Sequence, residues 1–279
     1  MTSAIQDVEN MTTELSGEEL VAECRARANI YRVLSGAFLE EPTVAYLNAL
    51  RSPEVMASLK DLGVAFGPDF TDVPVEQLQD ELANEYAVLF VVTGGCPAVE
   101  SIRLTGRFQQ QPFFEMREIY QKAGFEVKGG RFVVFDDQLG VQLMFVAEML
   151  DRAADALAAG KQDEYENVIK TIKRVWALHL GKWVRGYSTL LERATEYSFY
   201  REIAKLLGGF AEWELNLLGV KVDDLDQGRA KVPMADVEYE YDPSEPVCSA
   251  CEKGRTPDMV AEEQTIDVSM IEKRLQRNK

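Results

Sequence analysis

The sequence predicts an all-α protein. We expect a flexible N-terminus over residues 1–15, a single helical-bundle domain over 16–219, and a mostly irregular acidic tail over 220–279. Apolar residues recur at three- and four-residue steps, which is the period of a helix with one buried face. Few segments alternate with period two, so strands are not indicated. Apolar residues make up 46% of the 279 residues, enough for a packed core.

Local end signals mark where the first helices begin. Ser16 and Glu19 fit a capping box, and Ser52 with Pro53 fits an N-cap followed by a first-turn proline. Pro112 is expected in the first turn of a later helix. The predicted helices cover residues 16–39, 43–50, 75–90, 112–124, 137–160, 162–194 and 198–218, with a further short helix from Pro53. Glycine, proline and aspartate indicate a loop over 63–74, and residues 98–111 show no clear pattern.

The second half is organised around one long helix. Asp136 or Asp137 is expected to cap its start, and Gly160 to end it. The helix after it is expected to kink near Gly186, and Gly219 is the predicted stop of the last helix. Residues 129–135 form the most strand-like run, which we interpret as an extended loop. A terminal helix near 268–277 is also possible within the tail, which composition predicts to be dispensable for folding.

Composition and charge exclude several classes of protein. Thirty basic and 47 acidic residues give a net charge of −17, which disfavours nucleic acid and favours basic partners. No segment approaches a membrane span, and the N-terminus lacks a secretory signal, so we expect a cytoplasmic protein without membrane insertion. His179 is the only histidine, and no nucleophile–base or phosphate-loop motif is present. We therefore expect binding rather than catalysis, and no cofactor.

Two of the four cysteines form a Cys-x-x-Cys pair in the tail. Cys248 and Cys251 could bind zinc or an iron–sulfur cluster if two more ligands were supplied. Those ligands would have to be Cys24 and Cys96, or the same pair of a second chain. The alternative, which we favour, is an exposed dithiol. A metal- or redox-responsive binding protein is therefore the alternative functional hypothesis.

Six short motifs between residues 20 and 218 occur in an order and spacing that resemble one known family. These motifs are Tyr86-x-x-Leu89-Phe90, Pro97-x-x-Glu100-Ser101, Met116-Arg117-Glu118-Ile119-Tyr120 with Gly124-Phe125, Phe135-Asp136-Asp137-Gln138-Leu139-Gly140, Leu178-His179-Leu180-x-x-Trp183 and Phe199-Tyr200-Arg201-x-x-Ala204. The resemblance is to the TorD/DmsD/NarJ family of redox-enzyme maturation chaperones.

The resemblance implies an all-helical cytoplasmic chaperone that catalyses no reaction. Such proteins bind the apo catalytic subunit of a molybdenum enzyme of the dimethyl-sulfoxide-reductase superfamily, and many bind its twin-arginine signal peptide. They hold the subunit until the molybdopterin cofactor is inserted, and so prevent early export or assembly. The partners expected for this chain are therefore an apo catalytic subunit, its twin-arginine peptide, or both.

The resemblance also implies where a client would bind. The candidate client-binding residues are Tyr86, Leu89, Phe90, Pro97, Glu100, Ser101, Asp136, Asp137 and Gln138. An apolar groove rimmed by the three acids would hold a basic, apolar peptide, with client arginines paired to the carboxylates. Two departures from the family pattern affect this surface: the family's usual histidine is absent from Asp136-Asp137-Gln138, and its double proline is absent from the stretch after Pro97.

Each candidate also has a structural interpretation. Tyr86, Leu89 and Phe90 fit one face of a helix and are more often core than groove. Asp136 and Asp137 fit helix caps as well as client contacts, and both roles stay open. His179, between two tryptophans, is expected to be a packing residue.

Overall fold

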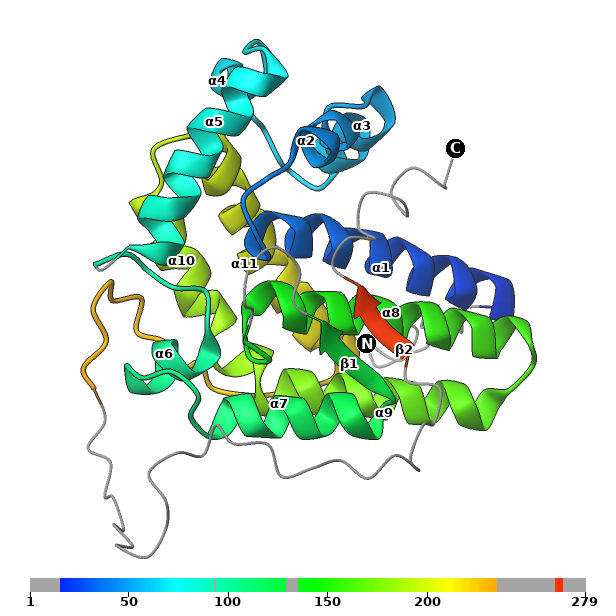
Figure 1. The fold of residues 1–279 in the computed structure, drawn as a ribbon. Coiled ribbons are helices and arrows are strands. Elements are labelled where there is room, and N and C mark those ends of the chain that lie inside the picture. The colour runs from blue at the N-terminus through cyan, green and yellow to red at the C-terminus, as the bar shows by residue number, and fades with distance from the viewer. Residues whose placement is uncertain (1–15, 93, 129–134, 235–263, 268–279) are drawn as a thin grey trace, which may run out of the picture.

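The computed structural model describes residues 16–92, 94–128, 135–234 and the backbone of 264–267. They form a helical bundle, which confirms the predicted all-α class (Figure 1). The α-helices are α1 (Gly17–Phe38), α2 (Val44–Leu50), α3 (Pro53–Asp61), α4 (Pro68–Thr71), α5 (Val75–Tyr86), α6 (Glu100–Thr105), α7 (Gln111–Lys122), α8 (Leu139–Ala158), α9 (Gln162–Leu178), α10 (Val184–Ala194) and α11 (Ser198–Leu218). Across these described residues, no helix is both long and apolar enough to cross a membrane.

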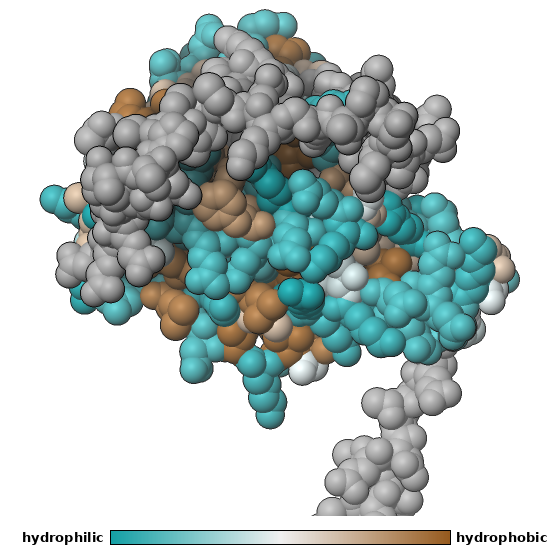
Figure 2. Space-filling model, turned by 60° about the horizontal axis from the view of Figure 1, so that its bottom comes forward, coloured by the Kyte–Doolittle hydropathy of each residue, from teal (hydrophilic) through white to brown (hydrophobic). Residues whose placement is uncertain are grey.

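Helix α8 lies at the centre because its N-terminal half, Leu139 to Ala147, is almost entirely apolar and buried on every side. Most of its length is buried, and α1 and α9 pack along it (Figure 1). A helix without a polar face needs neighbours all round. Outside the core, Figure 2 shows the underside of the same molecule, where hydrophilic side chains cover much of the surface and apolar atoms gather toward the lower left.

Buried polar contacts fix how α1 sits against its neighbours. Arg27 and Glu214 form a two-pronged ion pair, with both N–O distances 2.8 Å, between α1 and α11. The indole N–H of Trp176 donates to the hydroxyl of Tyr31 at 2.7 Å, joining α9 to α1. Directional contacts of this kind specify one packing among the many that apolar burial alone allows.

The end signals predicted at Ser16, Ser52 and Gly219 are confirmed. The Ser16 hydroxyl accepts from the Glu19 N–H, and the Glu19 carboxylate accepts from the Ser16 N–H at 2.7 Å, which completes the capping box. Ser52 caps α3 with Pro53 in its first turn. Gly219 ends α11 at a φ of 64°, a left-handed conformation that costs glycine little.

Two helix boundaries differ from the predicted ones. The predicted loop over 63–74 contains the one-turn helix α4. The predicted helix over 162–194 is broken at residues 179–183, by a short 3-10 turn, η2 (Leu180–Lys182), rather than kinked at Gly186. Gly186 lies inside α10, where a Cβ atom would overlap the carbonyl oxygen of Asp226. The glycine therefore makes room for another segment and does not bend the helix.

A short strand follows α7. Strand β1 (Phe125–Lys128) pairs in parallel with β2 (Gln264–Asp267), with Phe125 opposite Gln264. Most of the expected extended loop, residues 129–134, and the expected terminal helix near 268–277 lie outside the described residues.

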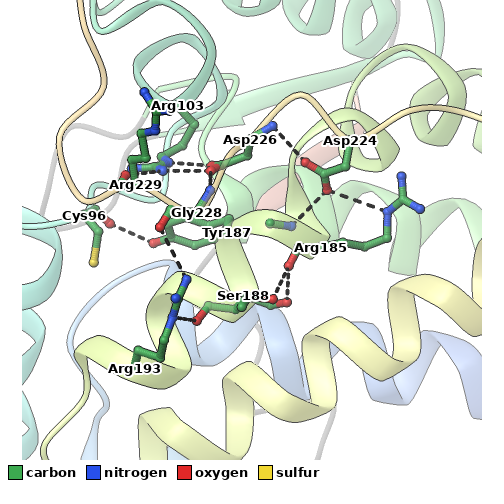
Figure 3. A network of polar contacts seen from close by, with 12 residues as sticks. Cys96, Arg103, Arg185, Tyr187, Ser188, Arg193, Asp224, Asp226, Gly228 and Arg229 are labelled. Atoms are coloured by element: carbon green, nitrogen blue, oxygen red, sulfur yellow. Dashed lines mark hydrogen bonds and ion pairs between the residues drawn. The ribbon is translucent and has the colours of Figure 1, made fainter.

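Residues 220–234, which we call the strap, are irregular as predicted but pack on the domain (Figure 3). Arg103 of α6 forms a buried, two-pronged ion pair with Asp226, at 2.7 and 2.9 Å. The Gly186 N–H donates to Asp224 at 2.9 Å, and Arg185 donates to the carbonyl of Val222 at 2.8 Å. The strap therefore joins α6 to α10.

We expect Asp226→Ala to destabilise the protein strongly, because it leaves Arg103 buried without its counter-ion. Removing one member of a buried pair costs about 3–5 kcal/mol, equivalent to a fall of about 6 °C or more in thermal midpoint for a chain of this size. Asp223→Ala, in the exposed part of the same strap, is the matched control. Equal midpoints for the two variants, measured by calorimetry, would show that the strap does not support the fold.

Candidate functional site

Two of the predicted client elements meet at the C-terminal end of α1. The hydroxyl of Tyr86 donates to the carbonyl of Phe38 at 3.3 Å, and the side-chain amide of Gln138 donates to the same carbonyl at 3.1 Å. Gln138 also donates to the carbonyl of Leu39 at 3.2 Å. The close approach requires Gly140, where a Cβ atom would come within 2.7 Å of Leu39. Residues far apart in the chain are thus brought together, as the resemblance implies.

The third element, around Pro97 to Ser101, is hydrogen-bonded to the start of α8. The backbone N–H of Leu139 donates to the carbonyl of Ala98 at 2.9 Å, and Val99 forms an antiparallel bridge with Gln138. Pro97 is half-buried beside this bridge. We call the place where α1, α6 and α8 meet the junction.

Asp137 caps a helix, but not the helix that follows it. Its carboxylate accepts from the backbone N–H of Ser101 at 2.8 Å, and its carbonyl accepts from the N–H of Glu100 at 3.0 Å. Both donors belong to the first turn of α6. The N-cap of α8 is Gln138, whose side chain makes no capping bond. The prediction that Asp136 or Asp137 caps the long helix is therefore wrong, because a carboxylate far along the chain serves α6 instead.

The Asp137 side chain is fully buried, and this sets its acidity. Burial raises the pKa of Asp137 above its ordinary value, and the nearby charge of Glu100 adds to the rise. The hydrogen bond from Ser101 acts in the opposite direction. Ser101 is itself buried, and its hydroxyl accepts from the N–H of Gln110 at 3.1 Å. Neither residue is placed to contact a client directly.

Glu100 is also internal. Its side chain is 1% exposed and accepts from the amide of Gln142 at 2.5 Å, while Nδ1 of His179 lies 3.2 Å from its carboxylate. The predicted position on a groove rim is therefore not observed. His179 is buried, as a packing residue should be, and its Nε2 lies 4.0 Å from Glu115 without a hydrogen-bond partner. The contact between His179 and Glu100 joins the break after α9 to the start of α6.

Asp136 is the predicted acid with access to a surface cavity. It accepts from Nε of Arg117 at 2.5 Å, and the guanidinium group of Arg117 lies 4.5 Å from the ring centre of Phe113. Asp136 and Arg117 line a cavity of about 250 Å³ together with Tyr120 and Phe125. The hydroxyl of Tyr120 donates to the carbonyl of Asp136 at 2.8 Å and holds the backbone in place. Asp136 is itself 7% exposed and reaches the surface only through this cavity, which neither Glu100 nor Asp137 lines.

The predicted apolar residues turn out to face the core. Phe90 contacts Phe38, Tyr86 and Tyr200 edge-on, with ring centres 6.0, 4.9 and 5.5 Å away. Leu89 is buried. The aromatic cluster fills the inner side of a π-helical turn, η1 (Ala87–Val91), which continues α5. The core interpretation of these residues, which the helical spacing favoured, therefore describes their positions.

The outer side of the same turn exposes three valines that the sequence analysis did not select. Val88, Val91 and Val92 are 61%, 68% and 48% exposed, and we call them the valine ridge. The signal was present in the sequence, since residues between the inward positions of a helix point outward. The run from Tyr86 to Val92 is apolar on both sides, which a one-sided core helix does not require.

The backbone after the ridge folds back over η1. The N–H of Cys96 donates to the carbonyl of Leu89 at 2.6 Å, which satisfies an acceptor at the end of the turn. Gly95 allows this approach, because a Cβ atom there would lie 2.6 Å from the Leu89 carbonyl oxygen. The ridge is therefore presented by a rigid turn rather than by a free loop.

The cysteines of the domain are buried thiols. Burial raises the pKa of both Cys24 and Cys96, so neither is a ready nucleophile. Cys248 and Cys251 lie outside the described residues. Among the residues that the structure describes, no group of three or more histidine, cysteine or acidic side chains is arranged to hold a metal ion.

We expect Asp137→Asn to change how stability depends on pH. The raised pKa means that the folded state holds this proton more tightly, so the stabilising contribution is full below the unfolded value near ~4 and is lost as pH rises through the folded value. Asparagine can still accept from Ser101 but does not titrate. As the pH rises above about 4, the thermal midpoint of the variant should therefore increase relative to that of the wild type. A difference in midpoint that stays constant with pH would contradict this account.

The comparison with protein families gives one match. The family model described as nitrate reductase delta subunit matches residues 52–187, which include η1, α6 and the start of α8. The comparisons with curated proteins and with solved structures gave no match. The matched range holds all nine residues selected by resemblance and the α6 and α8 sides of the junction, and over this range the chain is similar to the nitrate reductase delta subunit family, a family of molybdoenzyme assembly chaperones.

Proposed function

We propose that this chain is a cytoplasmic chaperone for the apo catalytic subunit of a molybdopterin-dependent oxidoreductase. It acts by binding alone, and keeps the subunit ready for cofactor insertion and assembly before export. The family supports the class of client, since its members bind molybdoenzyme catalytic subunits. The observation that carries the proposal for this chain is the valine ridge beside the junction.

The valine ridge has the properties of a docking surface for an apolar segment. Adjacent exposed valines expose apolar area to water, and contiguous apolar patches on soluble proteins mark interaction sites. The aromatic cluster behind the ridge holds its backbone still, which lowers the entropy lost on binding. The π-helical geometry is itself frequent at functional sites.

Asp136 supplies the polar part of the proposed surface. Tyr86, two residues before Val88, and Gln138, two residues after Asp136, bond to the same carbonyl of Phe38, so the ridge and the acid flank one junction. A twin-arginine peptide offers guanidinium groups followed by an apolar run. In this proposal an arginine displaces Arg117 from Asp136, and the apolar run covers the ridge. Glu100 and Asp137 act as positioning residues that hold α6 in place.

We expect the double change Val88→Ser, Val91→Ser to weaken client binding at least about tenfold without loss of fold stability. Two exposed valines that become buried contribute roughly 1.5–3 kcal/mol each, whereas their removal from a free surface costs the fold little. The measurement is calorimetric titration with the cofactor-free catalytic subunit of the source organism's molybdopterin oxidoreductase. The cofactor-loaded subunit is the control for client state.

Leu217→Ser is the matched control variant, because Leu217 is 45% exposed but lies on α11. Its affinity should equal that of the wild type. Equal weakening by this control would place binding outside the ridge, and no binding of the cofactor-free subunit by the wild type would refute the proposed function.

We expect Asp136→Asn to weaken binding of the client's twin-arginine peptide about tenfold, since a charge-assisted contact contributes roughly 1.5–3 kcal/mol. A peptide with both arginines replaced by lysine should bind the wild type more weakly and should respond less to the substitution. Unchanged affinity in the folded variant would leave Asp136 as a partner of Arg117 alone.

A further inference from the structure

A second surface, away from the junction, has the composition of a ligand site. An open cavity of about 470 Å³ lies between α7, α8 and α9. Its floor is formed by apolar side chains, among them Ile119, Met149 and Val168, one from each of these helices. Its volume lies in the range of small-molecule sites, about 300–1,000 Å³.

The rim of this cavity is basic, although the whole protein is strongly acidic. Lys122, Arg152 and Arg174 line it, each from a different helix, with Glu164 as the acid in the lining. The carboxylate of Glu164 also pairs with Lys161 at 3.1 Å. Lys122 also pairs with Glu118, one turn earlier on α7. Three cations therefore line an apolar floor in a chain whose net charge is −17, and Lys122 would exchange Glu118 for a bound anion. Such a site attracts an anion locally while the remaining surface repels it.

Arg152 is held in place before any ligand arrives. It donates to the carbonyl of Ala123 at 2.8 Å, and its guanidinium group lies 4.5 Å from the ring centre of Phe125. Burial lowers the pKa of Arg152, because the partly desolvated cation has lost hydration. The charges of Glu164 and Glu148 act in the opposite direction, and an anion in the cavity would add to their effect. Asn167 and Thr171 place an amide and a hydroxyl on the same wall.

We propose that this cavity binds a small organic phosphate: the planar or apolar body lies on the floor formed by Ile119, Met149 and Val168, and the phosphate meets the rim formed by Lys122, Arg152 and Arg174. Dianionic phosphate suits three converging cations, and guanidinium groups match its oxygens geometrically. We expect the ligand to have an organic body because inorganic phosphate alone would leave the apolar floor exposed to water. The inference is independent of the proposed function and of the valine ridge.

The test uses a pair of probes that differ by the phosphate alone. Flavin mononucleotide carries a planar ring system and a phosphate, and riboflavin carries the ring system without it. Titration of the full chain, followed by flavin fluorescence, should show saturable binding of one flavin mononucleotide per chain that weakens as salt is added. Riboflavin should bind at least about fivefold more weakly.

Matched variants then locate the site. Arg174→Gln and Lys122→Gln should each weaken flavin mononucleotide about fivefold or more and leave riboflavin unchanged. Lys173→Gln is the control, because Lys173 is the exposed neighbour of Arg174 on α9 but does not line the cavity, and it removes the same charge. Its affinity should equal that of the wild type.

Three outcomes would overturn the proposal. They are an absence of saturable binding, equal affinities for the two flavins, and equal weakening by Lys173→Gln and Arg174→Gln. The last outcome would show a diffuse charge effect in place of a site. Neither client binding nor the ridge variants enter these measurements, so this inference and the proposed function can fail separately.

Discussion

The burial of α8 is the constraint on which the rest of the structure depends. The nine residues from Leu139 to Ala147 are all buried, so water is excluded from every side of its N-terminal half. Helices α1 and α9 lie along its length, and the junction closes its N-terminal end. Because a helix end cannot be buried with its backbone donors unpaired, the segments that close this end must supply polar groups as well as apolar surface.

Local signals in the sequence were enough to predict much of the fold. The capping box at Ser16, the proline after Ser52 and the glycine at position 219 each act on neighbouring residues. The helix ends that they mark could therefore be predicted from the sequence alone. The break at residues 179–183 could not, because His179 departs from helical geometry where it contacts Glu100, far away in the sequence. Gly186 was misinterpreted for the same reason: its role becomes visible only with the strap beside it.

In the candidate site too, the sequence predicted what neighbouring residues determine and did not predict what tertiary contacts determine. The resemblance selected residues that the fold does bring together, but it could not state which of them face outward. Asp137 has the sequence context of a cap and is one, yet its helix is α6, and pairing of that kind depends on tertiary structure. The valines of the ridge carry no chemically distinctive group, so motif analysis passed over them in favour of Leu89 and Phe90, which are internal. Exposure of an ordinary residue is the property that sequence patterns report least well.

The ion pair between Arg103 and Asp226 has a consequence for how such chains diverge. Arg103 lies inside the range matched by the family model, whereas Asp226 lies well beyond its end. Loss of the carboxylate that pairs with a buried arginine lowers the free energy of unfolding by several kcal/mol. This is a large share of the ~5–15 kcal/mol that is typical of a whole domain. The two positions should therefore vary together, because replacing the arginine as well removes most of the cost of losing the aspartate. A change at a position after the matched range can therefore determine which residues are tolerated inside it.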